Sequence, residues 1–148
     1  MKKTMLILAA AALAASCTTL VPPEGYAVRR DAGSRDLLAV STDASALSLR
    51  VLRNEDPKAG TLAYWAEAAK KQLTLSRGYT SKEEGSFTTA KGPGRWFLFS
   101  QQHRGTEHLY LLGLVVKGKR IYALEAGGEA ALLADDVPHL VESFSTLR

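Results

Sequence analysis

Residues 95–116, RWFLFSQQHRGTEHLYLLGLVV, hold two apolar runs joined by a short polar segment. Apolar side chains occupy both alternating faces of each run; in the first, Trp96 and Leu98 alternate with Phe97 and Phe99. A strand that is apolar on both faces must be covered on both sides. The stretch therefore predicts an antiparallel hairpin in the middle of a sheet, with other elements packed on opposite faces of that sheet.

Further strands are expected on both sides of this hairpin. Glycines and polar residues between the apolar runs predict tight turns, and Gly127–Gly128 is expected to end the last strand. Residues 54–60 contain Pro57 and Gly60, which oppose helix and strand alike, so this segment is expected to be a loop. The further strands are predicted at residues 26–30, 37–42, 47–53, 86–90 and 120–126, and the turns at residues 91–94, 103–106 and 117–119.

Two segments have the period of an amphipathic helix instead. The first covers residues 61–76, with Gly78 expected in the left-handed conformation that follows a helix end. The second lies at the end of the sequence, with Pro138 in its first turn, Asp135 or Asp136 as its expected cap, and a short helical turn at 129–133 before it. The apolar stripes are Leu62, Trp65, Ala66, Ala69 and Leu73 in the first helix, and Val137, Leu140, Val141, Phe144 and Leu147 in the second.

These elements predict an α+β fold, in which helices cover both faces of an antiparallel sheet of hairpins (an α/β/α sandwich). We expect one domain over residues 26–148, because no internal repeat divides it. The order of elements resembles the PsbP-like fold, and residues 47–52, the helix around Trp65 and residues 120–126 carry the resemblance. That fold includes photosynthetic accessory proteins, transport-related adaptors and bacterial lipoproteins, so the resemblance implies binding rather than catalysis.

The first 16 residues are typical of a secretory signal peptide. Lys2 and Lys3 form a positive start, and residues 5–15 are an apolar run of 11 residues. As a helix this run spans about 17 Å, well short of the ~30 Å hydrocarbon core of a membrane. Residues 1–16 are therefore interpreted as a segment for export rather than a transmembrane helix.

The export signal ends at Cys17, the single cysteine of the chain. Leu13-Ala14-Ala15-Ser16-Cys17 resembles the lipobox of bacterial lipoproteins, although the aliphatic Leu13 lies one place earlier than usual. The resemblance implies a diacylglyceryl group on the Cys17 thiol and a mature chain that begins there. The alternative is ordinary secretory cleavage after Ala12-Leu13-Ala14, which would leave Cys17 as a free thiol.

A lipid at Cys17 would hold the protein on a membrane without inserting it. In enterobacterial lipoproteins, Asp at the next position signals retention in the inner membrane; Thr18 stands here, so the resemblance implies the outer membrane. The domain is expected to face the periplasm, with the cell surface as the alternative. Residues 17–25 are interpreted as the acylated cysteine and an extended spacer, because Pro22 and Pro23 disfavour other conformations. Such a spacer would lift the domain about 20–25 Å from the lipid.

Charge and cysteine content exclude several classes of protein. The chain has 19 Lys and Arg, and removal of Lys2 and Lys3 leaves 17 against 15 Asp and Glu, a net charge of +2. A charge this small does not favour binding to nucleic acid. One cysteine supports neither an intrachain disulfide nor a cysteine zinc site.

Few residues have the spacing that catalysis or metal binding requires. His103 and His108 would face each other if residues 104–107 formed a four-residue loop, and Glu107 would then be a possible third metal ligand. We favour two exposed histidines at a hairpin tip, and expect neither metal nor cofactor. Glu83-Glu84 is interpreted as part of a solvated loop. Arg29, Arg30, Arg35, Arg50 and Arg53 are interpreted as a mixed surface rather than one basic patch.

The functional expectation is a non-catalytic envelope lipoprotein that acts as an adaptor or accessory subunit of a larger assembly. Tyr64 lies on the helix face opposite the apolar stripe, where it either covers a loop or contacts a protein partner. The alternative is a carrier of a small ligand, with a cavity between sheet and helix lined by Trp96, Phe97 and Tyr110. The sequence identifies no partner or ligand.

Overall fold

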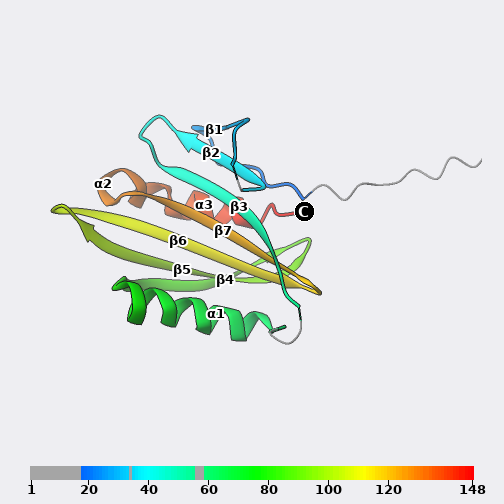
Figure 1. The fold of residues 1–148 in the computed structure, drawn as a ribbon. Coiled ribbons are helices and arrows are strands. Elements are labelled where there is room, and N and C mark those ends of the chain that lie inside the picture. Colours follow the sequence, from blue (N-terminus) through cyan, green and yellow to red (C-terminus); the bar gives the residue numbers. More distant parts are fainter. Residues whose placement is uncertain (1–17, 34, 56–58) are drawn as a thin grey trace, which may run out of the picture.

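The computed structural model describes residues 18–33, 35–55 and 59–148; the predicted signal peptide and Cys17 lie outside the described residues. The described chain forms a seven-stranded sheet in which every neighbouring pair of strands is antiparallel (Figure 1). The spatial order is β1-β2-β3-β7-β6-β5-β4. The strands are β1 (Tyr26–Val28), β2 (Leu37–Ser41), β3 (Ala46–Arg53), β4 (Thr80–Thr89), β5 (Gly92–His103), β6 (Thr106–Lys117) and β7 (Arg120–Glu129).

Helices lie on both faces of this sheet (Figure 1). One face carries α1 (Leu62–Lys71), which continues into the π-helical turn η1 (Gln72–Ser76). The other face carries α2 (Ala130–Leu133), the 3₁₀ turn η2 (Ala134–Asp136) and α3 (Val137–Phe144). The predicted α+β fold and α/β/α arrangement are therefore confirmed. Among the described residues, no helix is long and apolar enough to cross a membrane.

The two faces of β5 and β6 supply two separate hydrophobic cores, as the alternating apolar pattern predicts. Leu98 and Leu111 point toward α3, whereas Phe97 and Phe99 point toward α1. Burial on both faces is why these central strands carry almost no polar side chain over their middle residues. The predicted helix stripes are likewise buried or half-buried against the sheet.

A close approach between β6 and α3 defines the core on the α3 side. Phe144 is fully buried, and its ring lies directly over Gly113. A Cβ atom at position 113 would lie 2.6 Å from Phe144 Cδ2 and 2.8 Å from Cε2, so only glycine leaves room for the ring. A glycine in a central strand, which lowers strand stability by itself, therefore has a packing reason here.

The turns are shorter than expected, and two predictions about strand ends are wrong. Ala90–Lys91 and Gly118–Lys119 are two-residue turns, so residues 92–94 belong to β5 instead of a loop. Gly127–Gly128 lies inside β7, where it pairs with β6 and does not end the strand. Gly128 has a packing reason: a Cβ there would meet Ser45 Oγ at 2.6 Å. Composition alone cannot separate such glycines from turn glycines.

The strand β4 begins well before its predicted start, and Glu83-Glu84 is part of it rather than a solvated loop. The first part of β4 is almost wholly polar because it is an edge strand with exposed side chains. Its register against β5 shifts between Ser81 and Glu83, and such irregularities are common at sheet edges. Glu84 accepts a hydrogen bond from Lys70 of α1 at 2.7 Å, which ties the edge strand to the helix.

The segment after Cys17 belongs to the domain and is not a free spacer over its whole length. Thr19 and Arg148 exchange two backbone hydrogen bonds of 3.0 Å each, and Leu20, only 5% exposed, is part of the α3-side core. Val21 N–H donates to Thr146 Oγ1 at 2.9 Å, and Ser143 Oγ–H donates to the Val21 carbonyl at 2.6 Å. The predicted extended spacer over residues 17–25 is therefore wrong for residues 19–21. The domain begins at Thr19 rather than at Tyr26.

This packing predicts that Leu20→Ala lowers the free energy of unfolding by about 2–3 kcal/mol, because a buried leucine side chain is lost. Val21→Ala is the matched control, since Val21 is 62% exposed and should change stability by less than about 0.5 kcal/mol. Urea denaturation of both variants measures the difference. If both variants left the free energy of unfolding nearly unchanged, this packing would be contradicted and residues 19–21 would act as a free spacer.

Candidate functional site

A groove of about 340 Å³ lies between α1 and the sheet. The helix packs over β5 and β6 and leaves the surface of β7 and β3 open beside it. The floor of this α1 groove is apolar, with Leu112 and Leu114 from β6 and Ile121 and Ala123 from β7. The helical wall consists of Trp65, Ala69, Gln72, Leu73 and Arg77, and the opposite wall of Arg50, Leu52, Arg53, Tyr110 and Glu125.

Three polar side chains of the opposite wall bond to one another. Arg50 donates from Nε to Glu125 Oε2 at 3.0 Å and from Nη2 to Oε1 at 2.9 Å. Tyr110 donates from its hydroxyl to the same Oε1 at 2.6 Å. Burial raises the pKa of Tyr110 above its ordinary value, and the neighbouring Glu125 carboxylate raises it further. Because both oxygens of Glu125 are engaged, this cluster forms a fixed, neutral wall and provides no free general base.

The ends of the α1 groove are positively charged. Arg53 lies at the end of β3, opposite Arg120 in the register, and Arg77 follows η1 near the other end, where Gln101 donates to its carbonyl. Arg53 contacts Glu55 only loosely, at 3.8 Å between mostly exposed side chains. Arg50, Arg53 and Arg77 against Glu125 leave the lining with an excess of positive charge.

The helical wall changes geometry halfway along the groove. After Lys71 the helix widens into the π-helical turn η1, and Thr74 Oγ1–H donates to the Lys70 carbonyl at 2.8 Å. Gln72 and Leu73, the first residues of this turn, line the groove, and Gly78, at φ +71°, ends the helix as predicted. Short π-helical turns are rare and are concentrated at functional sites.

A groove does lie between helix and sheet, but only one of the three residues predicted to line a ligand cavity there lines it. Tyr110 lines the α1 groove, whereas Phe97 is buried beneath α1 and Trp96 packs on the opposite face of the sheet. Sequence reasoning did not assign Arg77 or Glu125 to any site. The alternation along β3 and β7 would place Arg50 and Glu125 on one face, but their pairing depends on the register between two strands distant in sequence.

Tyr64 is 57% exposed, and its ring lies over Gly60, where a Cβ atom would clash with it. The ring also meets Trp65 edge to face, with centroids 5.1 Å apart. The prediction that Tyr64 covers a loop is confirmed for this part of the loop. Its other predicted role, contact with a partner, stays a prediction.

His103 and His108 are near each other but not in the predicted way. The turn is Arg104–Gly105, both at positive φ, so His103 pairs with Thr106 and His108 with Gln101. The four-residue loop is therefore wrong, and the two rings meet diagonally with centroids 6.0 Å apart. Glu107 points to the other face of the sheet, toward Lys82 at 3.7 Å. In the part of the chain that the structure describes, no three His, Cys, Asp or Glu side chains are grouped to hold a metal ion.

The predicted mixed surface of early arginines is consistent with the ion pairs that they form. Arg29 binds Asp31 through two hydrogen bonds of 2.9 and 2.8 Å, and Arg50 binds Glu125. Arg29, Arg50 and Arg53 each have an acidic neighbour of their own, which interrupts any continuous basic patch.

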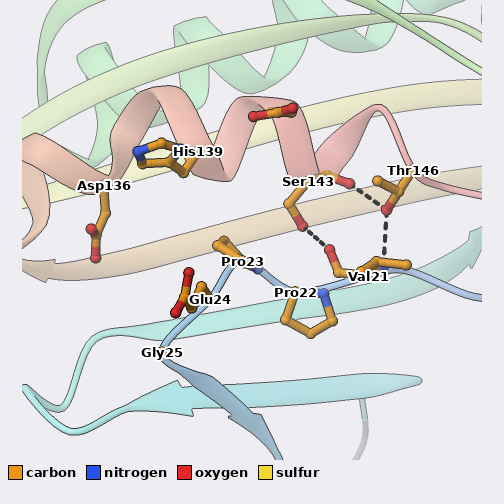
Figure 2. A pocket seen from close by; sticks show the side chains of 10 residues that line it. Val21, Pro22, Pro23, Glu24, Gly25, Asp136, His139, Ser143 and Thr146 are labelled. Carbon is orange, nitrogen blue, oxygen red and sulfur yellow. Dashed lines mark hydrogen bonds between the residues drawn. The ribbon is translucent and has the colours of Figure 1, made fainter.

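A second hollow, of about 540 Å³, lies between residues 21–25 and α3 (Figure 2). Its lining includes the carboxylates of Glu24, Asp136 and Glu142, and the His139 ring. Asp136, one of the two predicted caps, is the N-cap residue of α3, but its side chain makes no capping hydrogen bond; it accepts a hydrogen bond from the Tyr26 hydroxyl at 3.2 Å instead. Burial, followed by the nearby Asp136 charge, raises the pKa of Tyr26 to about 12.

Comparison with known proteins finds solved structures with a similar fold. No protein-family model and no curated protein sequence matches the chain. The solution structure of cyanobacterial PsbP (CyanoP) from Synechocystis sp. PCC 6803 matches at a TM-score of 0.57 and 9% identity, over 89% of this chain and 86% of that one. The fold is PsbP-like.

Two crystal structures extend this comparison. LpqN, described as involved in cell envelope biogenesis of Mycobacterium tuberculosis, matches at a TM-score of 0.65 and 12% identity, over 88% of this chain and 82% of that one. PA94 of Pseudomonas aeruginosa, a protein of unknown function described as a putative regulator, matches at a TM-score of 0.53 and 10% identity, over 83% and 80%. At such identities the likeness extends to the fold alone.

Proposed function

We propose that this protein is a lipid-anchored component of the bacterial cell envelope whose domain acts by non-covalent binding, as an adaptor or accessory subunit of a larger assembly. Cys17 carries the lipid, the outer membrane holds the anchor, and the domain faces the periplasm. The lipobox-like residues before Cys17 support the anchor. The fold likeness to LpqN, a protein described as involved in cell envelope biogenesis, supports the location.

The observation that carries the adaptor role is the exposed apolar surface of α1 and η1. Leu75 is 82% exposed and Tyr64 is 57% exposed, although the other side of the same helix is buried in the core. Large exposed apolar side chains on a rigid element are typical of contact sites for other proteins. The bonded Arg50–Glu125–Tyr110 cluster supports binding rather than catalysis, because its carboxylate is already occupied.

The anchor is tested by Cys17→Ser. The variant should move from the membrane pellet to the soluble periplasmic fraction, and mass spectrometry of the unaltered protein should show a diacylglyceryl mass on Cys17. Thr18→Asp is the matched variant for membrane choice: it keeps the lipid and should shift the protein toward the inner membrane. Unchanged fractionation of Cys17→Ser, together with a bare thiol, would contradict the anchor.

The adaptor role is tested by photo-crosslinking in living cells. A photoreactive amino acid at position 64 or 75 should give an adduct of one defined mass with a second protein. Position 132 is the matched control, because Leu132 is also a partly exposed leucine but lies in α2, on the opposite face of the sheet. No adduct from positions 64 and 75, or equal adducts from all three, would contradict the proposal.

A second candidate, a carrier of a small ligand, is favoured by one specific observation. The α1 groove combines a volume within the range of ligand pockets, about 300–1,000 Å³, with an apolar floor between helix and sheet. Its position between helix and sheet is the one predicted from the sequence for a carrier's cavity.

A further inference from the structure

We propose that the α1 groove binds a single-chain carboxylate amphiphile, with the alkyl chain on the floor formed by β6 and β7 and the carboxylate at an arginine of the groove ends. This inference rests on the second candidate function and names its ligand class.

The floor of the groove is suited to an alkyl chain. Leu112, Leu114 and Ile121 belong to the buried core of the α1 side, yet they also line the open groove. An alkyl chain along these residues would remove apolar surface of both the ligand and the groove from water. Each added methylene should therefore raise the affinity roughly fourfold. A ligand without an alkyl chain would leave this floor uncovered.

The charges of the groove select an anionic head. Among the described residues, Glu125 is the one carboxylate of the lining, and it is already bonded to Arg50 and Tyr110, so its negative charge is balanced within the wall. Arg53 and Arg77 then supply positive charge at the ends, and both guanidinium groups are exposed enough to turn toward a bound ligand. Guanidinium and carboxylate groups form paired, parallel hydrogen bonds, which makes a carboxylate a matched head group.

The size of the groove indicates one chain rather than two. Its volume of about 340 Å³ lies at the lower end of the range of ligand pockets, ~300–1,000 Å³. The Arg50–Glu125–Tyr110 cluster limits it on one side and α1 with η1 on the other. This volume favours a ligand with one alkyl chain over a two-chain phospholipid.

Binding is measured with defined probes on the full chain carrying Cys17→Ser, so that no attached lipid competes. Trp65 lines the groove, whereas Trp96 lies on the other face; adding Trp96→Phe therefore leaves Trp65 as a local fluorescent reporter. Decanoate should bind one to one in calorimetry and change Trp65 emission. Dodecanoate should bind about 15-fold more tightly, and 1-decanol at least tenfold more weakly, than decanoate.

Two sets of variants locate the site. Arg53→Gln with Arg77→Gln should weaken decanoate at least tenfold and leave 1-decanol unchanged, whereas Arg30→Gln, an exposed arginine outside the groove, should change neither. Ala69→Phe should fill the groove and abolish binding of both probes. Ala63→Phe, on an exposed position of the same helix, is its control, and thermal unfolding of each variant verifies the fold.

Three other results would each contradict one part of the inference. Equal affinity for decanoate and 1-decanol would refute the anionic head, and binding that survives Ala69→Phe in a folded protein would refute the groove. Binding of neither probe would refute the ligand class as a whole. None of these outcomes bears on fractionation of Cys17→Ser or on crosslinking from position 64, so failure here leaves the adaptor role standing.

Discussion

Phe144→Ala is expected to lower the free energy of unfolding by about 3–5 kcal/mol, which is a large part of the total stability of an ordinary domain. Phe144 is fully buried, its ring meets Phe87 at 5.8 Å between centroids, and it occupies the space above Gly113. Removing the ring leaves a cavity that the rigid central strands cannot close. Urea denaturation, with the slope checked for two-state behaviour, measures the loss.

A double-mutant cycle with Gly113→Ala tests the cause of this effect. Alone, Gly113→Ala should destabilise by about 1–3 kcal/mol, because its methyl group would lie 2.6 Å from the Phe144 ring. In the Phe144→Ala background the same change should cost nothing or stabilise, since strand glycine is intrinsically unfavourable. Gly127→Ala is the control, because the nearest atom lies at 3.5 Å. Additive effects of the two changes would contradict the proposed packing.

The second large effect is expected at Asn54, a buried polar side chain that joins three segments. Its Oδ1 accepts from Gly60 N–H at 2.7 Å and from Trp65 Nε1–H at 3.0 Å. Its Nδ2 donates to the Gly60 carbonyl at 2.9 Å and to the Gly118 carbonyl at 3.1 Å. Asn54→Ala would leave these groups without partners, so we expect a loss of about 2–4 kcal/mol.

Thermal unfolding and Trp65 emission measure the effect of Asn54→Ala. Asn54→Asp is the informative control, because it keeps the acceptor for Trp65 Nε1–H and removes the two donated hydrogen bonds. Because it also places a carboxylate oxygen of this buried side chain against the Gly60 and Gly118 carbonyls, it should destabilise at least as much as Asn54→Ala but preserve the emission maximum of Trp65. A stability of Asn54→Ala within about 0.5 kcal/mol of the parent would show that water replaces these bonds at no cost.

Periodicity was sufficient to predict most of the architecture of this domain. The two-faced apolar pattern of residues 95–116 required cover on both sides, and α1 and α3 supply it. The predicted strand boundaries were wrong where the hydrophobic pattern is weak. The first residues of β4 are polar because an edge strand has little to bury. Gly128 lies inside β7 because the Ser45 side chain needs the space that a Cβ atom would fill.

The candidate site was less predictable because it depends on contacts between distant strands. Arg50 and Glu125 are 75 residues apart, and only the register of β3 on β7 brings them together with Tyr110. The register at the Arg104–Gly105 turn likewise decides that His103 and His108 are diagonal neighbours. No local pattern states such a register; it follows from the packing of the whole sheet.

The pairing of Thr19 with Arg148 has a consequence for how the protein is made. Leu20 can pack only when the residues around position 147 are present, and β3 can pair with the central sheet only when β7 is present. Residues 19–21 and β3 therefore dock only after β7 and the residues that follow it have been made, because contacts so remote in sequence form late and slowly.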